Sequence, residues 1–498
     1  MPLEVMNTMK QLRPVMFVGT ASDVGKSVIA AGFCRIFKQD GYMPAPFKAQ
    51  NMSLNSYATP EGLEIGRAQA VQAEAAGVAC HTDMNPVLLK PTNDKSSQLV
   101  LHGKPAGNQT AWEYFMQDDK RQLFEEVKGA FDRLSVRYNP VVMEGAGSIS
   151  ELNLRHRDIT NMRMALHAGA AVYLISDIDR GGVFGSVYGT IALLPPEEKA
   201  LVKGIIINKF RGDIRLFEDG RKQLETLTGI PVTGVLPYYQ DIHIEEEDSV
   251  ALSLKHKRQT TGRINIAVVL LRHMSNFTDF NVLEKDERVN IFYTDNPADI
   301  VTADIVIVPG SKNTMSDLVA IKNNGTARAI TEAFKRNKVV IGICGGYQMM
   351  GISVADPHGV EGEPGSMPGL GILPVNTVLT REKITRQRRF SYRQQAASCE
   401  GYEIHMGHTT GETPSPLNVL DDGQPDGYFL SNRCWGTYLH GILDNTAVLD
   451  DLLAACGKTV TAAQSFDYRA FRSAQYDKLA AYIRQHLDME AVYKAICL

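Results

Sequence analysis

The chain has 498 residues, enough for about three domains of ordinary size. Hydrophobic residues make up 44% of it and charged residues 22%, which is typical of a globular protein and argues against a disordered or fibrous one. The formal net charge of -4 gives no broad electrostatic case for binding nucleic acid or an anionic membrane.

The first 14 residues have neither a long apolar core nor a basic flank, so we expect no secretory signal. No uninterrupted apolar run is long enough to span a bilayer. The seven cysteines form no CxxC pair, which predicts neither a disulfide framework nor a cysteine metal cluster. We therefore expect a soluble, cytoplasmic protein without a membrane partner.

A glycine-rich loop follows the first predicted strand. Residues 14–18 are apolar, and the chain then runs through Gly19 to Ser27 into an apolar helix that reaches Phe37. Strand, glycine loop and helix in this order are what a phosphate-binding loop requires, although five residues separate Gly19 from Gly25 where the common pattern has four. The alternative is a chance Gly-Lys-Ser at a helix start. The predicted nucleotide-binding residues are Gly19, Thr20, Gly25, Lys26 and Ser27, with Lys26 on terminal phosphates and Ser27 on Mg²⁺.

Polar residues follow the next predicted strand, which ends at Phe47. The region 66–77 is rich in Ala, Gln and Glu and predicts a helix, whose Arg67 and Gln69 could face a ligand or simply form a solvated face. A second amphipathic helix is predicted over 123–134. The substrate-side candidates here are Lys48, Gln50, Asn51, Arg67 and Gln69.

Three further predicted strands end in residues that suit a nucleotide site. The strand 141–144 ends at Glu144, and an acid at this position can hold Mg²⁺ directly or through water, unless it is only a turn acid. The strand 170–176 leads to Asp179 and Arg180 in a Gly-rich turn that could contact substrate or phosphate or be a plain turn. The strand 204–207 leads to Asn208, which could bond a purine edge or act as a cap.

The polar, basic stretch 253–262 has no periodicity and predicts a linker. It divides the chain into domains of residues 1–252 and 263–498. The order of strands and helices predicts a doubly wound α/β fold for the first domain, and a new α/β series begins at Ile264. In that series the predicted strand 304–308 ends in a turn with Gly310 and Ser311, whose N–H groups could stabilise an oxyanion.

The predicted strand 339–343 stops at Cys344, and glycines then open a predicted helix over 345–350. A cysteine at such a sharp turn lies over unpaired helix N–H groups, which favour the thiolate. The pattern is typical of a nucleophile elbow, and the alternative is a buried, inert cysteine. Cys344 is therefore the candidate nucleophile.

A cysteine nucleophile in acyl transfer needs a base. Residues 435–440 predict a strand that ends at His440, which would place its imidazole at the same sheet edge as Cys344. His405 and His408 lie on another possible strand, where their rings would point to opposite faces, and we expect structural or substrate-side roles for them. The basic run 381–389 favours a solvated face over a nucleic-acid patch. We expect the helical end of the chain, 466–492, to pack on the second domain.

Together these motifs resemble the cobyric acid synthases, the glutamine-dependent amidotransferases of cobalamin biosynthesis. The first half is similar to the dethiobiotin synthetase group of P-loop proteins, and the second to class I glutamine amidotransferases. The resemblance implies two doubly wound, mostly parallel-sheet domains and extends over nearly the whole chain. The stretches that carry it include Gly19–Ser27, 47–53, 64–69, 85–91, 144–147, 179–184, 208–213, 276–280, Cys344 and His440.

The resemblance implies that Cys344 attacks the side-chain amide of L-glutamine and that His440 manages the protons. It also implies that Gly310, Ser311, Gly345 and Gln348 bind glutamine or its oxyanion. Class I enzymes usually carry a glutamate two residues after the histidine, where this chain has Ile442. We therefore expect a Cys–His dyad or an orienting acid from elsewhere, with Asp444 the nearest candidate in sequence.

The implied reaction uses ATP and Mg²⁺ to activate carboxylates of a corrinoid substrate, which ammonia from glutamine then converts to amides. The implied acceptor is cobyrinic acid a,c-diamide, adenosylated or not, with amidation of the b, d, e and g side chains. The first alternative is the related synthase that makes the a,c-diamide. The second is a P-loop ATPase with an inactive amidotransferase-like tail, against which the intact Cys344 and His440 argue.

Overall fold

The computed structural model of the protein describes residues 10–93, 96–110, 120–245, 263–395, 398–458 and 466–498. The chain forms two compact units, and neither is a single stretch of sequence. The first unit contains 1–52, 65–244 and 472–498, and the second contains 53–64 and 245–471. The predicted linker 253–262 lies outside the described residues.

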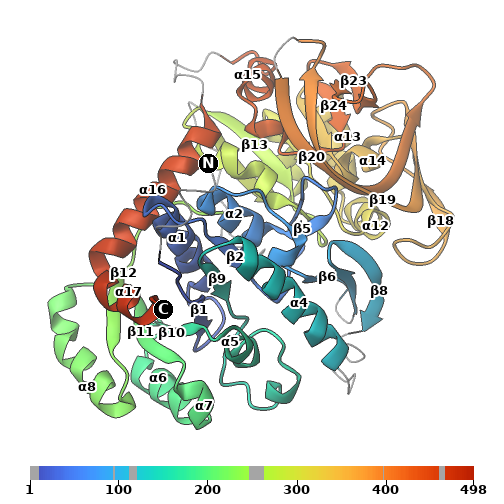
Figure 1. The fold of residues 1–498 in the computed structure, drawn as a ribbon. Coiled ribbons are helices and arrows are strands. Elements are labelled where there is room, and N and C mark those ends of the chain that lie inside the picture. The colour runs from blue at the N-terminus through green and yellow to red at the C-terminus, as the bar shows by residue number, and fades with distance from the viewer. Residues whose placement is uncertain (1–9, 94–95, 111–119, 246–262, 396–397, 459–465) are drawn as a thin grey trace. The chain divides into compact units, whose positions relative to one another are not determined.

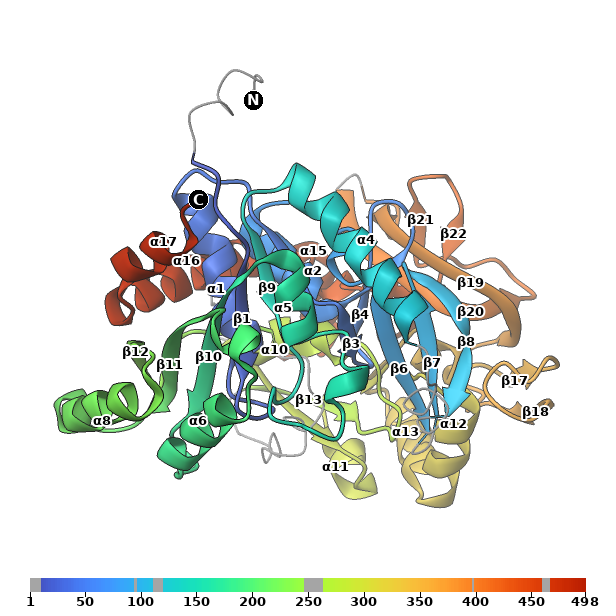
Figure 2. The ribbon, with the colours of Figure 1, turned by 60° about the horizontal axis from the view of Figure 1, so that its bottom comes forward.

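The first unit is built on a six-stranded parallel sheet in the order β12-β11-β10-β1-β9-β2. Its central strands are buried and rich in Val, Ile and Leu, as expected where helices cover both faces of a sheet. Figure 2 shows β12, β11, β10 and β1 side by side. The strands are β1 (Val15–Gly19), β2 (Ala45–Phe47), β9 (Val141–Glu144), β10 (Ala171–Asp177), β11 (Val202–Phe210) and β12 (Val232–Pro237). This sheet confirms the predicted doubly wound fold.

The helices of the first unit follow the predicted alternation with strands. They are α1 (Lys26–Gln39), α2 (Arg67–Ala76), α4 (Arg121–Arg137), α5 (Met162–Ala168), α6 (Val183–Ala192), α7 (Pro196–Lys199) and α8 (Glu218–Thr228), with short 3-10 turns η2 (Thr82–Met84), η3 (Arg155–Arg157) and η4 (Ile214–Phe217).

A second sheet in this unit has the order β3-β6-β7-β8, and Figure 2 shows β6, β7 and β8 side by side. Its strands are β3 (Gln50–Met52), β6 (Val87–Asn93), β7 (Ser96–Leu101) and β8 (Lys104–Thr110). Sequence analysis did not predict this sheet, in which the apolar side chains of Leu88 and Val100 pair across β6 and β7.

The C-terminal helices α16 (Tyr468–His486) and α17 (Met489–Ile496) are helical as predicted, but the expectation that they pack on the second domain is wrong for residues 472–498. Leu479 and Ile483 of α16 lie in one hydrophobic core with Phe33 of α1. Gly32 of α1 permits this close approach, because a Cβ there would lie 2.2 Å from Ile483 Cδ1. Figure 1 shows α16 (red) alongside α1 (blue). The physical reason is that the apolar face of α1 needs a cover, and α16 supplies it.

The second unit contains a six-stranded sheet in the order β14-β13-β15-β16-β24-β23, in which only β23 is antiparallel to its neighbour. Its strands are β13 (Ile264–Val269), β14 (Val289–Thr294), β15 (Ile305–Val308), β16 (Val339–Ile343), β23 (Tyr428–Ser431) and β24 (Cys434–Thr437). Around them lie η5 (Phe277–Phe280), α10 (Asn281–Lys285), α11 (Pro297–Thr302), α12 (Thr314–Asn323), α13 (Thr326–Lys335), α14 (Gly345–Met350), η6 (Ile442–Asp444) and α15 (Thr446–Ala454).

A mostly antiparallel sheet completes the second unit. Its strands are β17 (Ser353–Asp356), β18 (Gly365–Pro368), β19 (Val375–Tyr392), β20 (Ser398–Gly411), β21 (Asn418–Leu420), β22 (Pro425–Asp426) and β25 (Leu439–His440). The predicted strand 435–440 is thus two strands, because β24 ends at Thr437 and His440 lies on β25, which pairs with β20. On β20, His405 is buried and His408 is exposed, so their rings face opposite sides as expected.

Residues 53–64, which the sequence assigned to the first domain, belong to the second unit and include the short strand β4 (Ser56–Ala58). The adjoining strand β5 (Glu64–Gly66) leads to α2. Across the described ranges, the structure contains no helix with the length and apolar character needed to cross a membrane.

Candidate active sites

Cys344 lies at a sharp turn between β16 and α14, as the nucleophile-elbow pattern predicts. Its backbone has φ 51 and ψ -110, a conformation that L-residues rarely adopt. Such a conformation costs about 1–3 kcal/mol and persists only where the surroundings enforce it. Here the Cys344 N–H donates to Thr437 O at 2.8 Å, and the Cys344 carbonyl accepts from Gln348 N at 3.1 Å. The strained turn therefore holds the thiol in one direction.

Glycines allow the end of β15 to approach this turn. A Cβ on Gly346 would lie 1.9 Å from Val308 O, and one on Gly345 would lie 2.8 Å from Ser311 N. A Cβ on Gly310 would lie 3.3 Å from His440 Cε1. The structure thus brings the predicted oxyanion residues together with the predicted nucleophile and base.

The imidazole of His440 is 1% exposed and is held by Asp279. Nδ1 of His440 lies 2.7 Å from Asp279 Oδ2, and Gly441 N–H donates to Asp279 Oδ1 at 2.9 Å. Burial acts to lower the pKa of His440, but the negative charges of Asp279 and Cys344, together with its hydrogen bonds to both, raise that pKa to about 10. The arrangement favours an imidazolium at His440 at neutral pH.

Asp279 is a functional residue that sequence reasoning missed. It lies in the stretch 276–280, which resembles the family but had no role assigned to it. Asp444 was the nearest candidate in sequence for the acid that orients His440. The structure instead places Asp279, 161 positions away in sequence, against Nδ1 of His440. The sequence does contain an indication of this role. An acid between Phe277 and Phe280 is expected to be buried by these neighbours, and a buried carboxylate needs a partner.

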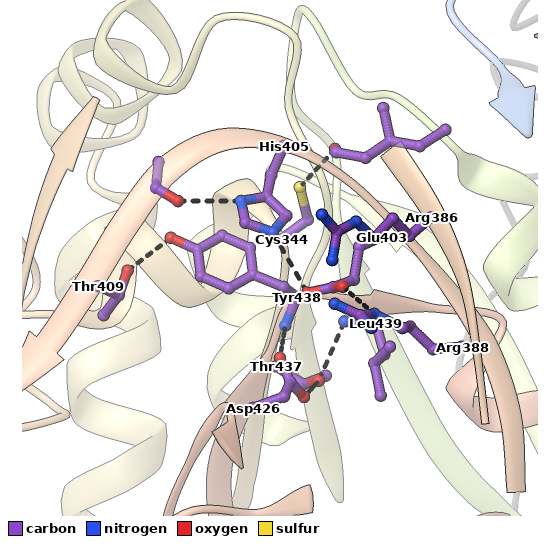
Figure 3. A network of polar contacts seen from close by, with 12 residues as sticks. Cys344, Arg386, Arg388, Glu403, His405, Thr409, Asp426, Thr437, Tyr438 and Leu439 are labelled. Atoms are coloured by element: carbon purple, nitrogen blue, oxygen red, sulfur yellow. Dashed lines mark hydrogen bonds and ion pairs between the residues drawn. The ribbon is translucent and has the colours of Figure 1, made fainter. Parts of the chain in front are cut away.

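Gln348, predicted to bind glutamine, is 3% exposed and is fixed at both ends of its amide. Its Oε1 accepts from Thr314 Oγ1 at 3.0 Å, and its Nε2 donates to the hydroxyl of Tyr438 at 3.2 Å. The ring of His405 stacks on Tyr438 with centroids 3.8 Å apart. Figure 3 shows His405 and Tyr438 next to the Cys344 sulfur, which donates to Ile404 O at 3.6 Å.

Glu403 joins this network to the basic run. It receives Arg388 Nε at 2.5 Å and lies 3.5 Å from His405 Nε2 (Figure 3). Burial raises the pKa of Glu403, but His405 and Arg388 lower it overall, which keeps the carboxylate ionised. The side chains of Arg386 and Arg389 are 60% and 74% exposed, so the predicted solvated face holds for them. Lys383 and Arg388 are exceptions, because only 9% and 10% of their side chains are exposed.

In the first unit, Glu144 is surrounded by Ser27 of the phosphate loop and by Lys48 and Gln72. Ser27 Oγ donates to Glu144 Oε1 at 2.7 Å, Lys48 Nζ approaches the same oxygen at 2.9 Å, and Gln72 Nε2 donates to Oε2 at 2.7 Å. Burial raises the pKa of Glu144, but Lys48 and these hydrogen bonds lower it overall. The carboxylate is therefore ionised next to a hydroxyl, the kind of oxygen donors that Mg²⁺ takes together with substrate phosphates.

Lys26 folds back over its loop, where Nζ donates to Ala21 O at 3.0 Å and Gly147 O at 2.9 Å. The loop is anchored on β10 through Thr20, whose N–H donates to Ile175 O at 3.0 Å. The Gly147 contact brings the end of β9 to the loop. The predicted phosphate and metal residues therefore share one edge of the sheet.

Asn208 lies beside Gly25, whose Cβ, if present, would be 2.3 Å from Asn208 Nδ2. That nitrogen donates to Val24 O at 2.8 Å. Among the described residues, Asn208 Oδ1 is buried with no hydrogen-bond partner. A free buried acceptor of this kind fits the exocyclic amino group of a purine.

The substrate-side candidates fall into two groups. In the first group, Asn51 Nδ2 donates to Gln69 Oε1 at 3.2 Å. Asn51 is close to Lys48 in sequence, and Gln69 is close to Arg67. Gln50 lies on β3. Asp179 and Arg180 lie on an exposed turn at the phosphate loop, where Arg180 is 3.9 Å from Asp23. Asp179 Oδ1 forms an ion pair with Arg211 Nε at 2.6 Å, so the charge of this carboxylate on the turn is already paired.

Comparison with known proteins matches both halves of the chain. Residues 15–250 match the family model of the CobQ/CobB/MinD/ParA nucleotide binding domain, and residues 265–448 match that of the CobB/CobQ-like glutamine amidotransferase domain. A protein named cobyric acid synthase from Parabacteroides distasonis is 64% identical over 495 residues, which cover 98% of this chain and 100% of that protein. Proteins of the same name from Bacteroides fragilis (62% identity, 98% and 99% covered) and Klebsiella pneumoniae (46% identity, 96% and 97% covered) also match.

Proposed function

The chain belongs to the cobyric acid synthase family, and from this premise we propose that it is a glutamine-hydrolysing ligase that amidates a corrinoid acid with ATP. The proposed acceptor is (adenosyl)cobyrinic acid a,c-diamide, amidated at its b, d, e and g carboxylates. The observation that carries the proposal is the grouping of Cys344, His440 and Asp279. It supplies a nucleophile, a proton carrier and an orienting acid within one unit.

In the glutaminase reaction, the Cys344 thiolate attacks the side-chain amide carbon of glutamine. N–H groups at Gly310, Ser311 and Gly345 stabilise the oxyanion that forms. His440 gives its proton to the departing nitrogen, ammonia leaves, and a thioester remains on Cys344. His440, now neutral, takes a proton from the water that hydrolyses the thioester, which releases glutamate and restores the starting charges.

In the amide-forming reaction, ATP with Mg²⁺ supplies the phosphoryl group that turns a substrate carboxylate into an acyl phosphate, and ammonia displaces that phosphate. Lys26 would bind phosphate oxygens, and Ser27 and Glu144 would provide oxygen ligands for the metal. Lys48 balances the charge of Glu144, and Asn208 binds the base through its free carbonyl oxygen. The candidates for contact with the acceptor remain Lys48, Gln50, Asn51, Arg67, Gln69, Asp179 and Arg180.

The proposal assigns amide synthesis to the unit of residues 1–52, 65–244 and 472–498, and glutamine hydrolysis to the unit of residues 53–64 and 245–471, in a cytoplasmic enzyme. The mass of the product formed from ATP, glutamine and each corrinoid acid tests it. Four amidations of the a,c-diamide support the proposal. Two amidations of cobyrinic acid would identify the related a,c-diamide synthase, and no amidation would leave a P-loop ATPase with an inactive tail.

A further inference from the structure

The segment 53–59 comes from the N-terminal half of the chain but lies in the second unit. Its polar residues are deeply buried there: Asn55 is 0% exposed and Ser56 is 1% exposed. Buried polar groups need partners, and Asn55 and Ser56 each form a hydrogen bond with a residue of the glutaminase half. The segment is therefore part of the glutaminase structure.

Asn55 and Asn276 form a reciprocal pair of side-chain to backbone hydrogen bonds. Asn55 Oδ1 accepts from Phe277 N at 3.1 Å, and Asn276 Oδ1 accepts from Ser56 N at 3.1 Å. We call this pair of bonds the asparagine clasp. Asn276 has φ 52 and ψ 40, a left-handed conformation that asparagine tolerates better than most residues.

The asparagine clasp lies at the start of η5, the turn that carries Asp279. Asp279 N–H donates to the Asn276 carbonyl at 3.0 Å, so the clasp and the acid share one short piece of backbone. The two carboxylate oxygens of Asp279 then hold His440 Nδ1 and Gly441 N. A displacement at Asn276 would move the carboxylate that orients the imidazole.

A second contact leads from the same segment to the same ring. The ring centroids of Tyr57 and Tyr402 lie 4.5 Å apart. The ring of Tyr402 stacks on that of His440, with centroids 5.3 Å apart and an interplanar angle of 26°. Ala58 packs with Tyr402 and Ile404 in a small buried cluster. The segment thus supports the imidazole on its Nδ1 side and on its face.

We propose that Asn55 and Asn276 are positioning residues of the glutaminase reaction, and that the N-terminal half of the chain supplies one side of the asparagine clasp that fixes Asp279 against His440. The inference rests on the proposed glutaminase function. Neither asparagine touches the reacting atoms. Their effect reaches the reaction through the place and charge state of His440.

The test uses the full-length variants Asn55→Ala and Asn276→Gly. Glycine at 276 keeps the left-handed backbone without strain while it removes the acceptor, so this variant carries the test if Asn55→Ala does not fold. We expect kcat for glutamate release to fall about tenfold or more, because a small displacement of a catalytic group has a large kinetic effect. We expect KM for glutamine to change less than about twofold.

A purely structural role would not move the pH profile, whereas a positioning role moves it. If Asp279 is no longer held against His440, its charge raises the pKa of His440 by less than in the wild type. The alkaline limb of the kcat profile then shifts to lower pH. Ammonia-dependent amidation by the same variants should stay at the wild-type rate, because it does not use Cys344 or His440. Tyr57→Ala should shift the profile in the same direction through Tyr402.

The matched control is Gln387→Ala. Gln387 Nε2 donates to Ala58 O at 2.9 Å, at the far end of the same segment from Asp279. This variant should keep the wild-type kcat and pH profile. If its pH profile shifted as much as those of the clasp variants, the shift would reflect a general loosening of the segment, and the inference would be overturned. Variants of the clasp with unchanged kcat and profile would also overturn it. A wild-type enzyme that releases no glutamate would instead refute the proposed function.

Discussion

Asp279 Oδ2 lies 2.7 Å from Nδ1 of His440, although 161 positions separate the two residues in sequence. This contact fixes the ring orientation and leaves Nε2 to face the thiol of Cys344. Class I amidotransferases usually have a glutamate two residues after the histidine. In this chain that position is Ile442, which is completely buried. An acid from another part of the unit therefore takes the orienting role.

Replacement of Asp279 by asparagine should change the pH dependence of glutamine hydrolysis. In the wild type, Asp279 and Cys344 raise the pKa of His440 above its ordinary value, so the imidazolium persists as the pH rises towards about 10. Without the carboxylate the pKa falls, the imidazolium is lost at lower pH, and the alkaline limb of kcat moves down. We also expect kcat to fall by about 10²–10⁴-fold, as in other triads.

Glutamate release measured across the pH range checks this prediction. Asp444→Asn is the matched control, because it removes a carboxylate close to His440 in sequence that is not bonded to Nδ1, and it should retain the wild-type profile. An Asp279→Asn profile identical to the wild type would contradict the orienting role.

Cys344→Ala should abolish amidation with glutamine and leave amidation with ammonia intact. The physical reason is that only the thiol releases nitrogen from glutamine, whereas the amide bond forms at the phosphate loop. Product formation with each nitrogen source measures the effect. Cys434→Ala, another buried cysteine of the same unit, is the control for the loss of a thiol. Loss of both activities in Cys344→Ala would contradict separate reaction sites.

Lys26→Ala should remove amide formation with either nitrogen source, because the acyl phosphate needs the terminal phosphate held in place. Glutamine hydrolysis itself should remain measurable. The comparison is Lys222→Ala, which removes an exposed lysine on α8. Normal turnover of Lys26→Ala with ammonia would rule out the phosphate-loop role.

Lys48→Ala should destabilise the first unit, because it leaves Glu144 as a buried carboxylate without its cation. Breaking a buried ion pair in this way costs about 3–5 kcal/mol. In the wild type the pKa of Glu144 lies below its ordinary value, so its stabilising contribution is present above the ordinary carboxyl pKa and is lost as pH falls through the lowered one.

In Lys48→Ala, burial without the cation raises that pKa, so stability should instead increase as the pH is lowered from neutrality towards the carboxyl range. Denaturant unfolding at several pH values measures both effects. The double variant Lys48→Met with Glu144→Gln, which leaves no unpaired charge, should recover part of the lost stability. A Lys48→Ala variant as stable as the wild type would show that the pair is not needed for the fold.

Ile483→Ala should loosen the first unit, because Ile483 is 0% exposed and packs in the core that contains α1. Such truncations cost about 2–5 kcal/mol. Hydrogen exchange of the α1 amides should rise in this variant. Leu452→Ala, an equally buried truncation in α15 of the second unit, should leave α1 exchange unchanged. Unchanged exchange in Ile483→Ala would contradict the packing of α16 on the first unit.

The parallel strands and the residues at their ends were predictable because their signal is local. A run such as 339–343 followed by Cys344 and glycines specifies its own strand, turn and helix. The long hairpin of β19 and β20 was not predicted, because the basic run 381–389 within β19 lacks the apolar alternation that indicates a strand. Asp279 was missed for a different reason, since its partner lies in a distant stretch of the chain.

The two units exchange pieces of chain: residues 53–64 of the N-terminal half belong to the second, and residues 472–498 return to the first. A gene divided once, between the halves, would therefore encode two fragments that each lack part of their own fold. The first fragment would lose the cover of α1, and the second would lose the partner of Asn276. Among enzymes of this architecture, a version made as two separate polypeptides would have to restore both pieces from other sequence.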